Sequence, residues 1–170
     1  GKRVIPEGVI YSMFNSEKHI ITYLKGKPLE MFFSGDGGQN DATSVSCNIV
    51  TTHKGKFYLH RVANYYHSGA DTGQTKAMSD YAREIKEFIN WCVDKFEMYY
   101  SNVFIDPACK SLKEELRKIG INARNADNNS KDIKGSTKGI EVGIERTQNL
   151  LSDMQLYLVE MSEEYGHYSF

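Results

Sequence analysis

Two aspartates, Asp36 and Asp106, each stand at the end of a short apolar run that is typical of a buried strand. Burying a lone carboxylate is costly, so an acid in such a place usually lies beside a cation or a cluster of donors. On adjacent strands the two carboxylates would lie within about 4–7 Å and would repel each other unless a divalent cation lay between them. Hard oxygen ligands suit Mg²⁺ or Mn²⁺. Two such ions can activate a water and stabilise the leaving oxygen in phosphodiester cleavage.

Structural roles for the same residues fit the spacing as well. Asp36 precedes two glycines and could begin an Asx turn, while Asp106 precedes Pro107 and could cap a helix that begins there. Asp41 could support the metal site from the turn after Asp36, or it could simply cap that turn before Ala42. The spacing alone leaves these alternatives open.

The elements that must position the two aspartates follow a recognisable order. Apolar segments joined by short loops predict three antiparallel strands, at residues 31–36, 42–52 and 57–66. After a polar loop at residues 67–76, an apolar stripe at helical spacing predicts a long helix at residues 78–96, in which Trp91 is a packing residue.

A strand, a helix and a parallel strand are predicted next, at residues 102–106, 107–120 and 121–126, with Gly120 closing the helix. A last helix at residues 139–152 and an extended segment or strand at residues 155–160 follow. This order indicates an α/β fold of the ribonuclease-H-like class. Such a fold has a mixed sheet of about five strands, the first three antiparallel and the later ones parallel, with helices on both faces.

Composition sets the broad class. The 170 residues suit one domain, and 40% hydrophobic residues can build one core. We expect residues 1–30 to be a lead-in packed on a domain formed by residues 31–170. No apolar run approaches the roughly 20 residues that span a bilayer, and no signal-peptide pattern is present. The three cysteines and five histidines lack the spacing of a zinc site, and the net charge of -1 gives no global sign of nucleic-acid binding.

Several segments resemble the nuclease domain of large terminase subunits from tailed phages and prophages. Residues 34–43 (SGDGGQNDAT) are similar to the first acidic motif of that family, and residues 104–108 (FIDPA) to its second. Weaker similarities follow in family order, at residues 6–11, 65–69, 72–74, 143–151 and 163–168. Each motif is unspecific alone, so the resemblance depends on their order and spacing over nearly the whole chain.

The resemblance implies a metal-dependent DNA endonuclease that cuts concatemeric viral DNA during genome packaging, in the cytoplasm of the host bacterium. Asp36 and Asp106 would be the catalytic metal ligands, with Mg²⁺ or Mn²⁺ in a two-metal site. The implied partners are double-stranded DNA, the terminase ATPase domain, the portal and the small terminase subunit, with no membrane. No GxxxxGK[ST] phosphate loop is present, so the ATPase part is not in this sequence.

The same family places a third acidic ligand in a segment that would follow Phe170, so we expect the C-terminal end of the domain to be incomplete here. The acids inside the chain that could replace it are Glu141, Glu145 and Asp153, which we interpret as surface residues. DNA contacts are predicted at Lys131, Lys134 and Lys138, with Arg124 nearby, because lysines on a polar loop suit phosphate contacts. A solvated loop that carries lysines by chance is the alternative.

Two other functions fit the same acids. One is another ribonuclease-H-like enzyme, of the resolvase or integrase type. The other is a non-catalytic module that keeps the fold for docking in the packaging machinery, for which the missing third acid is the best argument.

Overall fold

The computed structural model describes residues 9–37, 42–127 and 138–160. Within this part of the chain the elements run in the following order: α1 (Ser16–His19), β1 (Ile20–Ile21), β2 (Lys27–Asp36), β3 (Thr43–His53), β4 (Lys56–His67), α2 (Gly69–Thr72), α3 (Met78–Phe96), β5 (Tyr100–Ile105), α4 (Lys110–Lys118), β6 (Ala123–Asn125), α5 (Lys138–Ser152) and β7 (Leu156–Val159). None of the helices in these ranges is long and apolar enough to cross a membrane.

The strands form one mixed sheet in the order β1-β7-β4-β3-β2-β5-β6. Strands β2, β3 and β4 pair antiparallel, whereas β5 and β6 add in parallel on one side and β7 and β1 in parallel on the other. The predicted fold class is therefore confirmed. The predicted count of about five strands is too low, because β1 and β7 extend the sheet beyond β4.

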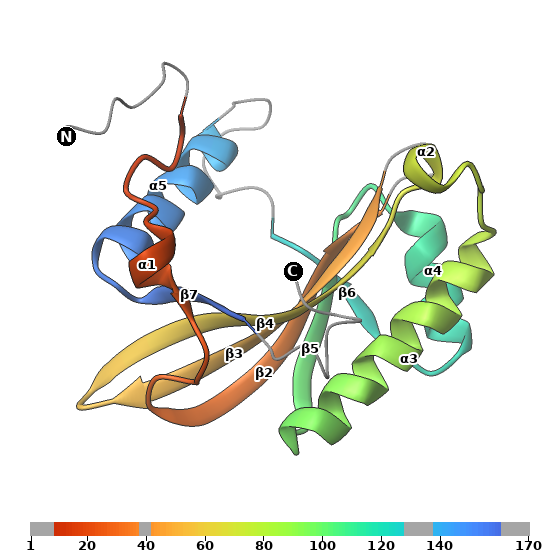
Figure 1. The fold of residues 1–170 in the computed structure, drawn as a ribbon. Helices are drawn as coiled ribbons and strands as arrows, with labels where there is room; N and C mark the ends of the chain where they lie inside the picture. The colour runs from red at the N-terminus through yellow and green to blue at the C-terminus, as the bar shows by residue number, and fades with distance from the viewer. Residues whose placement is uncertain (1–8, 38–41, 128–137, 161–170) are drawn as a thin grey trace.

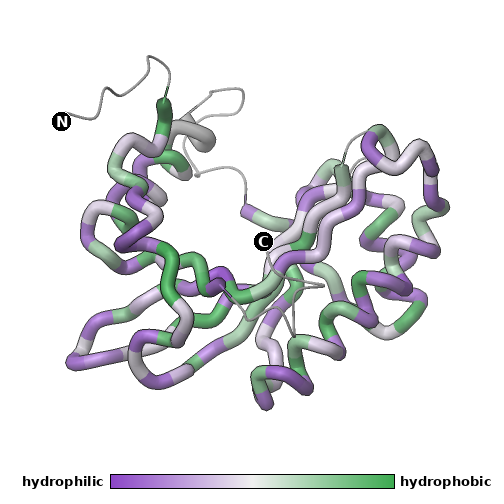
Figure 2. Tube along the Cα trace, in the orientation of Figure 1, coloured by the Kyte–Doolittle hydropathy of each residue, from purple (hydrophilic) through white to green (hydrophobic). Residues whose placement is uncertain are grey.

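A continuous core fills the space between one face of the sheet and helices α3 and α4. Helix α3 presents an apolar stripe to the sheet, and Phe88 packs edge-on against Phe33 of β2. Figure 1 shows α3 and α4 together on one side of the sheet, while α1 and α5 lie on the other side. In Figure 2 the hydrophobic residues concentrate in the strands and on α3, and the β3–β4 turn is hydrophilic.

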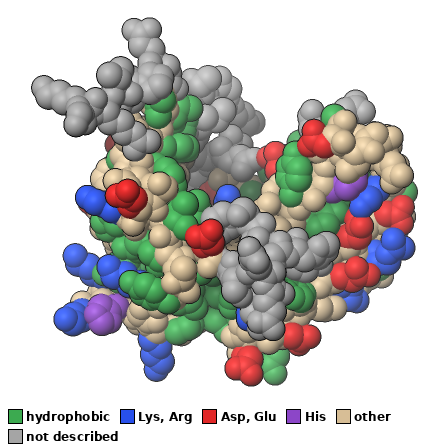
Figure 3. Space-filling view, viewed as in Figure 1, with side chains coloured by type: hydrophobic (Ala, Val, Ile, Leu, Met, Phe, Trp, Pro, Cys, Tyr) green, Lys and Arg blue, Asp and Glu red, His purple; other side chains and the backbone are tan. Residues whose placement is uncertain are grey.

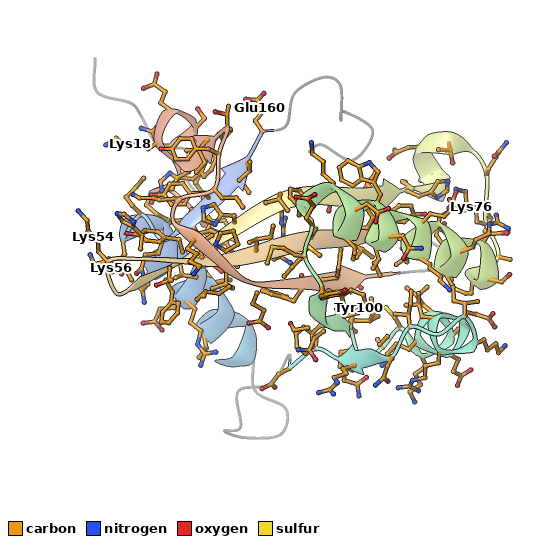
Figure 4. The ribbon with its side chains drawn as sticks, turned by 90° about the horizontal axis from the view of Figure 1, so that it is seen from below. Lys18, Lys54, Lys56, Lys76, Tyr100 and Glu160 are labelled. Atoms are coloured by element: carbon orange, nitrogen blue, oxygen red, sulfur yellow. The ribbon has the colours of Figure 1, made fainter. Side chains whose placement is uncertain are left out.

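The β3–β4 hairpin turns at Lys54 and Gly55, as predicted. Both residues have positive φ, 49° and 78°, which is the geometry of a tight hairpin turn that follows the twist of the strands. Lys54 and Lys56 lie at this end of the sheet, opposite the end that carries Lys76 (Figure 4).

Three local predictions are wrong. Residues 67–76 contain the short helix α2, which Ser68 caps by accepting a hydrogen bond from the Asp71 amide. Helix α4 begins at Lys110 rather than at Pro107. Strand β2 begins at Lys27, four residues before its predicted start, because Lys27 and Pro28 already pair with β3.

Candidate metal site at the ends of β2 and β5

Strands β2 and β5 are neighbours and run parallel, with Gly35 paired to Ile105. One residue further along, the Asp106 amide donates a hydrogen bond of 3.0 Å to the Gly35 carbonyl. The backbone thus continues the parallel ladder to the point where both acids leave the sheet. The prediction that Asp36 and Asp106 end adjacent parallel strands is confirmed; their role as metal ligands stays a prediction.

The side chains of the two aspartates lie close together. Carboxylate oxygens of Asp36 and Asp106 and the Cys109 sulfur all lie within 4.8 Å of one another, which is the only such group of candidate ligands among the residues that the structure describes. Asp36 is exposed and Asp106 is half-buried. The separation matches the predicted span, and an exposed edge lets water and ions reach the pair.

Asp106 also shapes the chain around it. Its Oδ1 accepts a hydrogen bond of 2.7 Å from the Ala108 amide, and its carbonyl accepts one of 3.0 Å from the Cys109 amide. These bonds form an Asx-type turn before α4. Asp106 therefore forms a turn and does not cap a helix at Pro107, as the spacing had allowed; α4 begins at Lys110, with Cys109 as its N-cap residue.

Cys109 lies beneath the acid pair and was not identified from the sequence as part of this site. Its Sγ accepts from the Gly37 amide at 3.3 Å and donates to the Gly37 carbonyl at 2.7 Å, with Asp36 Oδ1 at 3.6 Å. Burial raises the pKa of the Cys109 thiol and the negative charges of Asp36 and Asp106 raise it further, against the lowering effect of the Gly37 hydrogen bond. Cys109 is thus a neutral thiol that holds the turn after β2.

Gly35 allows the strands to approach closely next to Asp36. A Cβ at this position would lie 2.8 Å from Val45 Cγ2 and 2.9 Å from the Ser44 carbonyl oxygen, distances that real side chains do not adopt. A larger residue would therefore push β3 away and shift the end of β2. The glycine fixes the position from which Asp36 projects.

The acid pair opens into a polar pocket of about 300 Å³ on the face of the sheet opposite the core. Its lining consists of Ser34, Gly35, Asp36, Ser44, Ser46, Arg61, Asp106 and Ala126. The serines follow from strand alternation, because Ser34 and Asp36, like Ser44 and Ser46, are two residues apart and share a face. That signal was available in the sequence, whereas nothing in it identified Arg61.

The other predicted site residues divide into two groups. Asp41, Lys131 and Lys134 lie outside the described residues, and the side chain of Lys138, at the start of α5, is outside them as well. Arg124 is exposed on β6 and pairs in register with Phe104 of β5. Among the described residues, neither Glu145 nor Asp153 joins the acid pair.

No protein-family model matches the sequence, and a comparison with curated proteins found no match. Solved structures do match. The large terminase of a thermophilic bacteriophage superposes with a TM-score of 0.69 at 21% identity, over 89% of this chain and 33% of that one. The P22 large terminase nuclease domain gives a TM-score of 0.60 at 12% identity, over 90% and 73%. The large terminase nuclease from thermophilic phage G20c with bound magnesium gives 0.51 at 15% identity, over 91% and 76%.

The chain has the fold of a large terminase nuclease domain. It spans about a third of the length of the first of these terminases, and it covers most of the isolated P22 and G20c nuclease domains. The G20c nuclease has been crystallised with cobalt as well as with magnesium.

Proposed function

We propose that this chain is a divalent-metal-dependent endodeoxyribonuclease domain that cuts concatemeric viral DNA during genome packaging. The observation that carries the proposal is the acid pair, in which Asp36 and Asp106 end adjacent parallel strands with ligand atoms within 4.8 Å. The terminase nuclease fold supports it, and so do the metal-bound structures of the G20c nuclease.

The donor set at the acid pair fits Mg²⁺ or Mn²⁺. Asp36 forms no ion pair with any residue that the structure describes, so its charge is left for a cation to balance. Asp36 and Asp106 offer the hard oxygen donors that these ions prefer to sulfur. Asp36 and Asp106 would therefore hold the metal between them.

Such ions would supply Lewis-acid stabilisation of charge on the phosphate and activation of a water. The chain's own contribution is position. The Asp106 amide is fixed to Gly35, and the Asp106 carboxylate is held by the Ala108 amide, so its orientation is set before substrate binds. Asp36 is exposed beside it and can adjust to a cation.

The packaging role carries further proposals. By analogy with the large terminases that it resembles, the partners of this chain would be double-stranded DNA, a terminase ATPase domain, a portal and a small terminase subunit, in the host cytoplasm. The predicted contacts of Lys131, Lys134, Lys138 and Arg124 with DNA phosphates belong to this proposal. Arg124 supports it by lying exposed on β6, the strand next to β5.

The test is metal-dependent nicking of supercoiled plasmid by the full-length protein. We expect cleavage with Mn²⁺ or Mg²⁺, none with EDTA, and loss of cleavage in Asp36→Asn. Asp80→Asn is the matched control, because Asp80 is a half-buried acid outside the acid-pair pocket that pairs with Arg83 on α3. Wild-type activity in Asp36→Asn would refute the metal role of Asp36.

The same assay separates the alternatives. A folded wild-type protein that binds packaging partners but cleaves no DNA would be a docking module. A preference for synthetic four-way junctions over linear duplex would favour a resolvase-type enzyme.

A further inference from the structure

We propose that Arg61, with the hydroxyl group of Ser34, binds a phosphate of the DNA backbone beside the acid pair. The inference deepens the proposed nuclease function and rests on it. Arg61 and Ser34 line the same polar pocket as Asp36 and Asp106. The ligand would be a phosphodiester of the DNA strand that enters the site, recognised by charge and not by base sequence.

A β-bulge directs Arg61 onto this face of the sheet. Cys47 pairs with Ala63 but Asn48 pairs with Arg61, so Val62 is an extra residue in β4. Val62 and Ala63 consequently both face the core, and Arg61 faces the opposite side together with the pocket. Bulges that redirect a side chain are common next to active sites.

Arg61 is a cation that the fold leaves available. Its guanidinium has no hydrogen bond or ion pair with any residue that the structure describes. It is exposed, but the surrounding protein partly desolvates it and lowers its pKa. An arginine remains charged at neutral pH even so, and a partly desolvated guanidinium is suited to paired hydrogen bonds with phosphate oxygens.

The surface between Arg61 and the acids is polar and uncharged. Ser34 Oγ and Ser46 Oγ lie 3.0 Å apart, and Asn48 Nδ2 donates to Ser34 Oγ at 3.3 Å. Ser46 is buried and its hydroxyl donates to the Ser34 carbonyl, so the half-buried Ser34 is the serine whose hydroxyl can turn toward an anion. The surface between Arg61 and Asp36 therefore offers a phosphate a hydroxyl group without the repulsion that a carboxylate would cause.

The spacing favours a phosphate next to the cleaved one. Asp36 pairs with Ser44, and Arg61 pairs with Asn48, four residues further along β3. The Cα atoms of Asp36 and Arg61 are therefore separated by two strand-to-strand spacings across the sheet and by the length of four residues along a strand, which together place them roughly 16 Å apart. The Arg61 side chain shortens this gap without closing it, so the guanidinium would hold a flanking phosphate.

Other cations are less suited to this role. Lys54 and Lys56 lie at the far end of the sheet (Figure 4), and in Figure 3 basic side chains gather at that end. Lys76 lies toward the other end (Figure 4), but it pairs with Glu84 at 2.7 Å. Arg61 is the described cation that lines the acid-pair pocket.

The test measures binding of a short duplex by the full-length protein in Ca²⁺, without cleavage, over a series of salt concentrations. We expect Arg61→Gln to bind about tenfold or more weakly, as for removal of a charge-assisted hydrogen bond. The slope of log affinity against log salt should become shallower by about 0.9, because the variant neutralises one phosphate fewer. Arg61→Lys should keep the slope. Arg83→Gln is the matched control, because Arg83 is an exposed arginine on α3.

An unchanged salt slope in Arg61→Gln, or an equal weakening in Arg83→Gln, would overturn the inference. If thermal melting shows that Arg61→Gln is misfolded, Arg61→Met decides, because it also removes the charge but keeps an unbranched apolar side chain. A shallower salt slope in that variant supports the inference, and a wild-type slope overturns it. Failure of the proposed function is distinguishable, because the wild-type protein would then bind no DNA in Ca²⁺ and cut none in Mn²⁺.

Discussion

Replacing Asp36 by asparagine should stabilise the metal-free protein. The change removes one of two negative charges whose oxygens lie within 4.8 Å, and it keeps the shape and the Oδ1 atom that Cys109 contacts. Coulomb's law at that distance gives a repulsion of about 0.9 kcal/mol in bulk water and about 3.5 kcal/mol at an effective dielectric constant of 20. Because Asp36 is exposed, we take the lower end, about 1 kcal/mol.

For a chain of 170 residues, 1 kcal/mol corresponds to a rise in Tm of about 2–4 °C. Addition of Mn²⁺ should reverse the order. Metal that binds only the folded state stabilises the wild-type protein by about 1.4 kcal/mol at ten times its Kd, and Asp36→Asn should lose most of this gain. Thermal melts with EDTA and across a Mn²⁺ titration measure both effects on the same samples, with Asp80→Asn as control.

Two results would refute this reasoning. A large fall in Tm of Asp36→Asn in EDTA would show that Asp36 stabilises the turn after β2 and that repulsion is negligible. Equal stabilisation of wild type and variant by Mn²⁺ would show that the ion binds elsewhere.

Three further outcomes follow from buried or paired titratable groups. Burial lowers the pKa of His60, so the free energy of unfolding should decrease as the pH is lowered past about 6.5, by at most about 1.4 kcal/mol per pH unit. His60→Gln should remove this pH dependence, which urea titrations between pH 5.5 and 7.5 would measure. Lys113→Met should lower the free energy of unfolding by about 2–3 kcal/mol and reduce cleavage, because the buried ammonium donates hydrogen bonds to the Pro107 carbonyl and to Asn125. A variant that keeps both its activity and its full stability would contradict this. Burial opposes ionisation of Glu84, but hydrogen bonds from Lys76 and Tyr65 outweigh it and lower the pKa of the carboxyl. Glu84→Gln should therefore be less stable than wild type by about 1 kcal/mol at pH 7, and the difference should disappear well below pH 4.5.

The strand ends that carry the acid pair were predictable because apolar runs that end at Asp36 and Asp106 identify buried strands. The pairing of these two strands is long-range, because β3, β4 and α3 lie between β2 and β5 in the chain, and it follows from the expected fold as a whole. The start of α4 was not predictable in the same way. Pro107 favours the first turn of a helix, but Asp106 takes the Ala108 amide into its own turn, and the helix begins only at Lys110.

The edges of the sheet and the pocket lining gave weaker signals. Strand β1 has two residues and β7 has four, too few for alternation to distinguish a strand from an extended loop. Arg61 depends on the bulge at Val62, which a sequence of continuous β character does not reveal. Cys109 enters the site through the turn that follows Asp106, and its spacing to other cysteines and histidines carries no information about that turn.

The position of the site follows from the different roles of the two faces of the sheet. Alternation along β2 sends Met31 and Phe33 into the core beneath α3, and it sends Ser34 and Asp36 to the opposite face. On that face Leu151 of α5 and Phe32 line a mainly apolar pocket, and the polar pocket toward the end of β2 adjoins it and shares Ser34 and Arg61 with it. A charged pair on the core face would be buried under α3 and α4 at a high desolvation cost. The exposed end of the opposite face is therefore where this fold can hold two carboxylates together at low cost and within reach of water and ions.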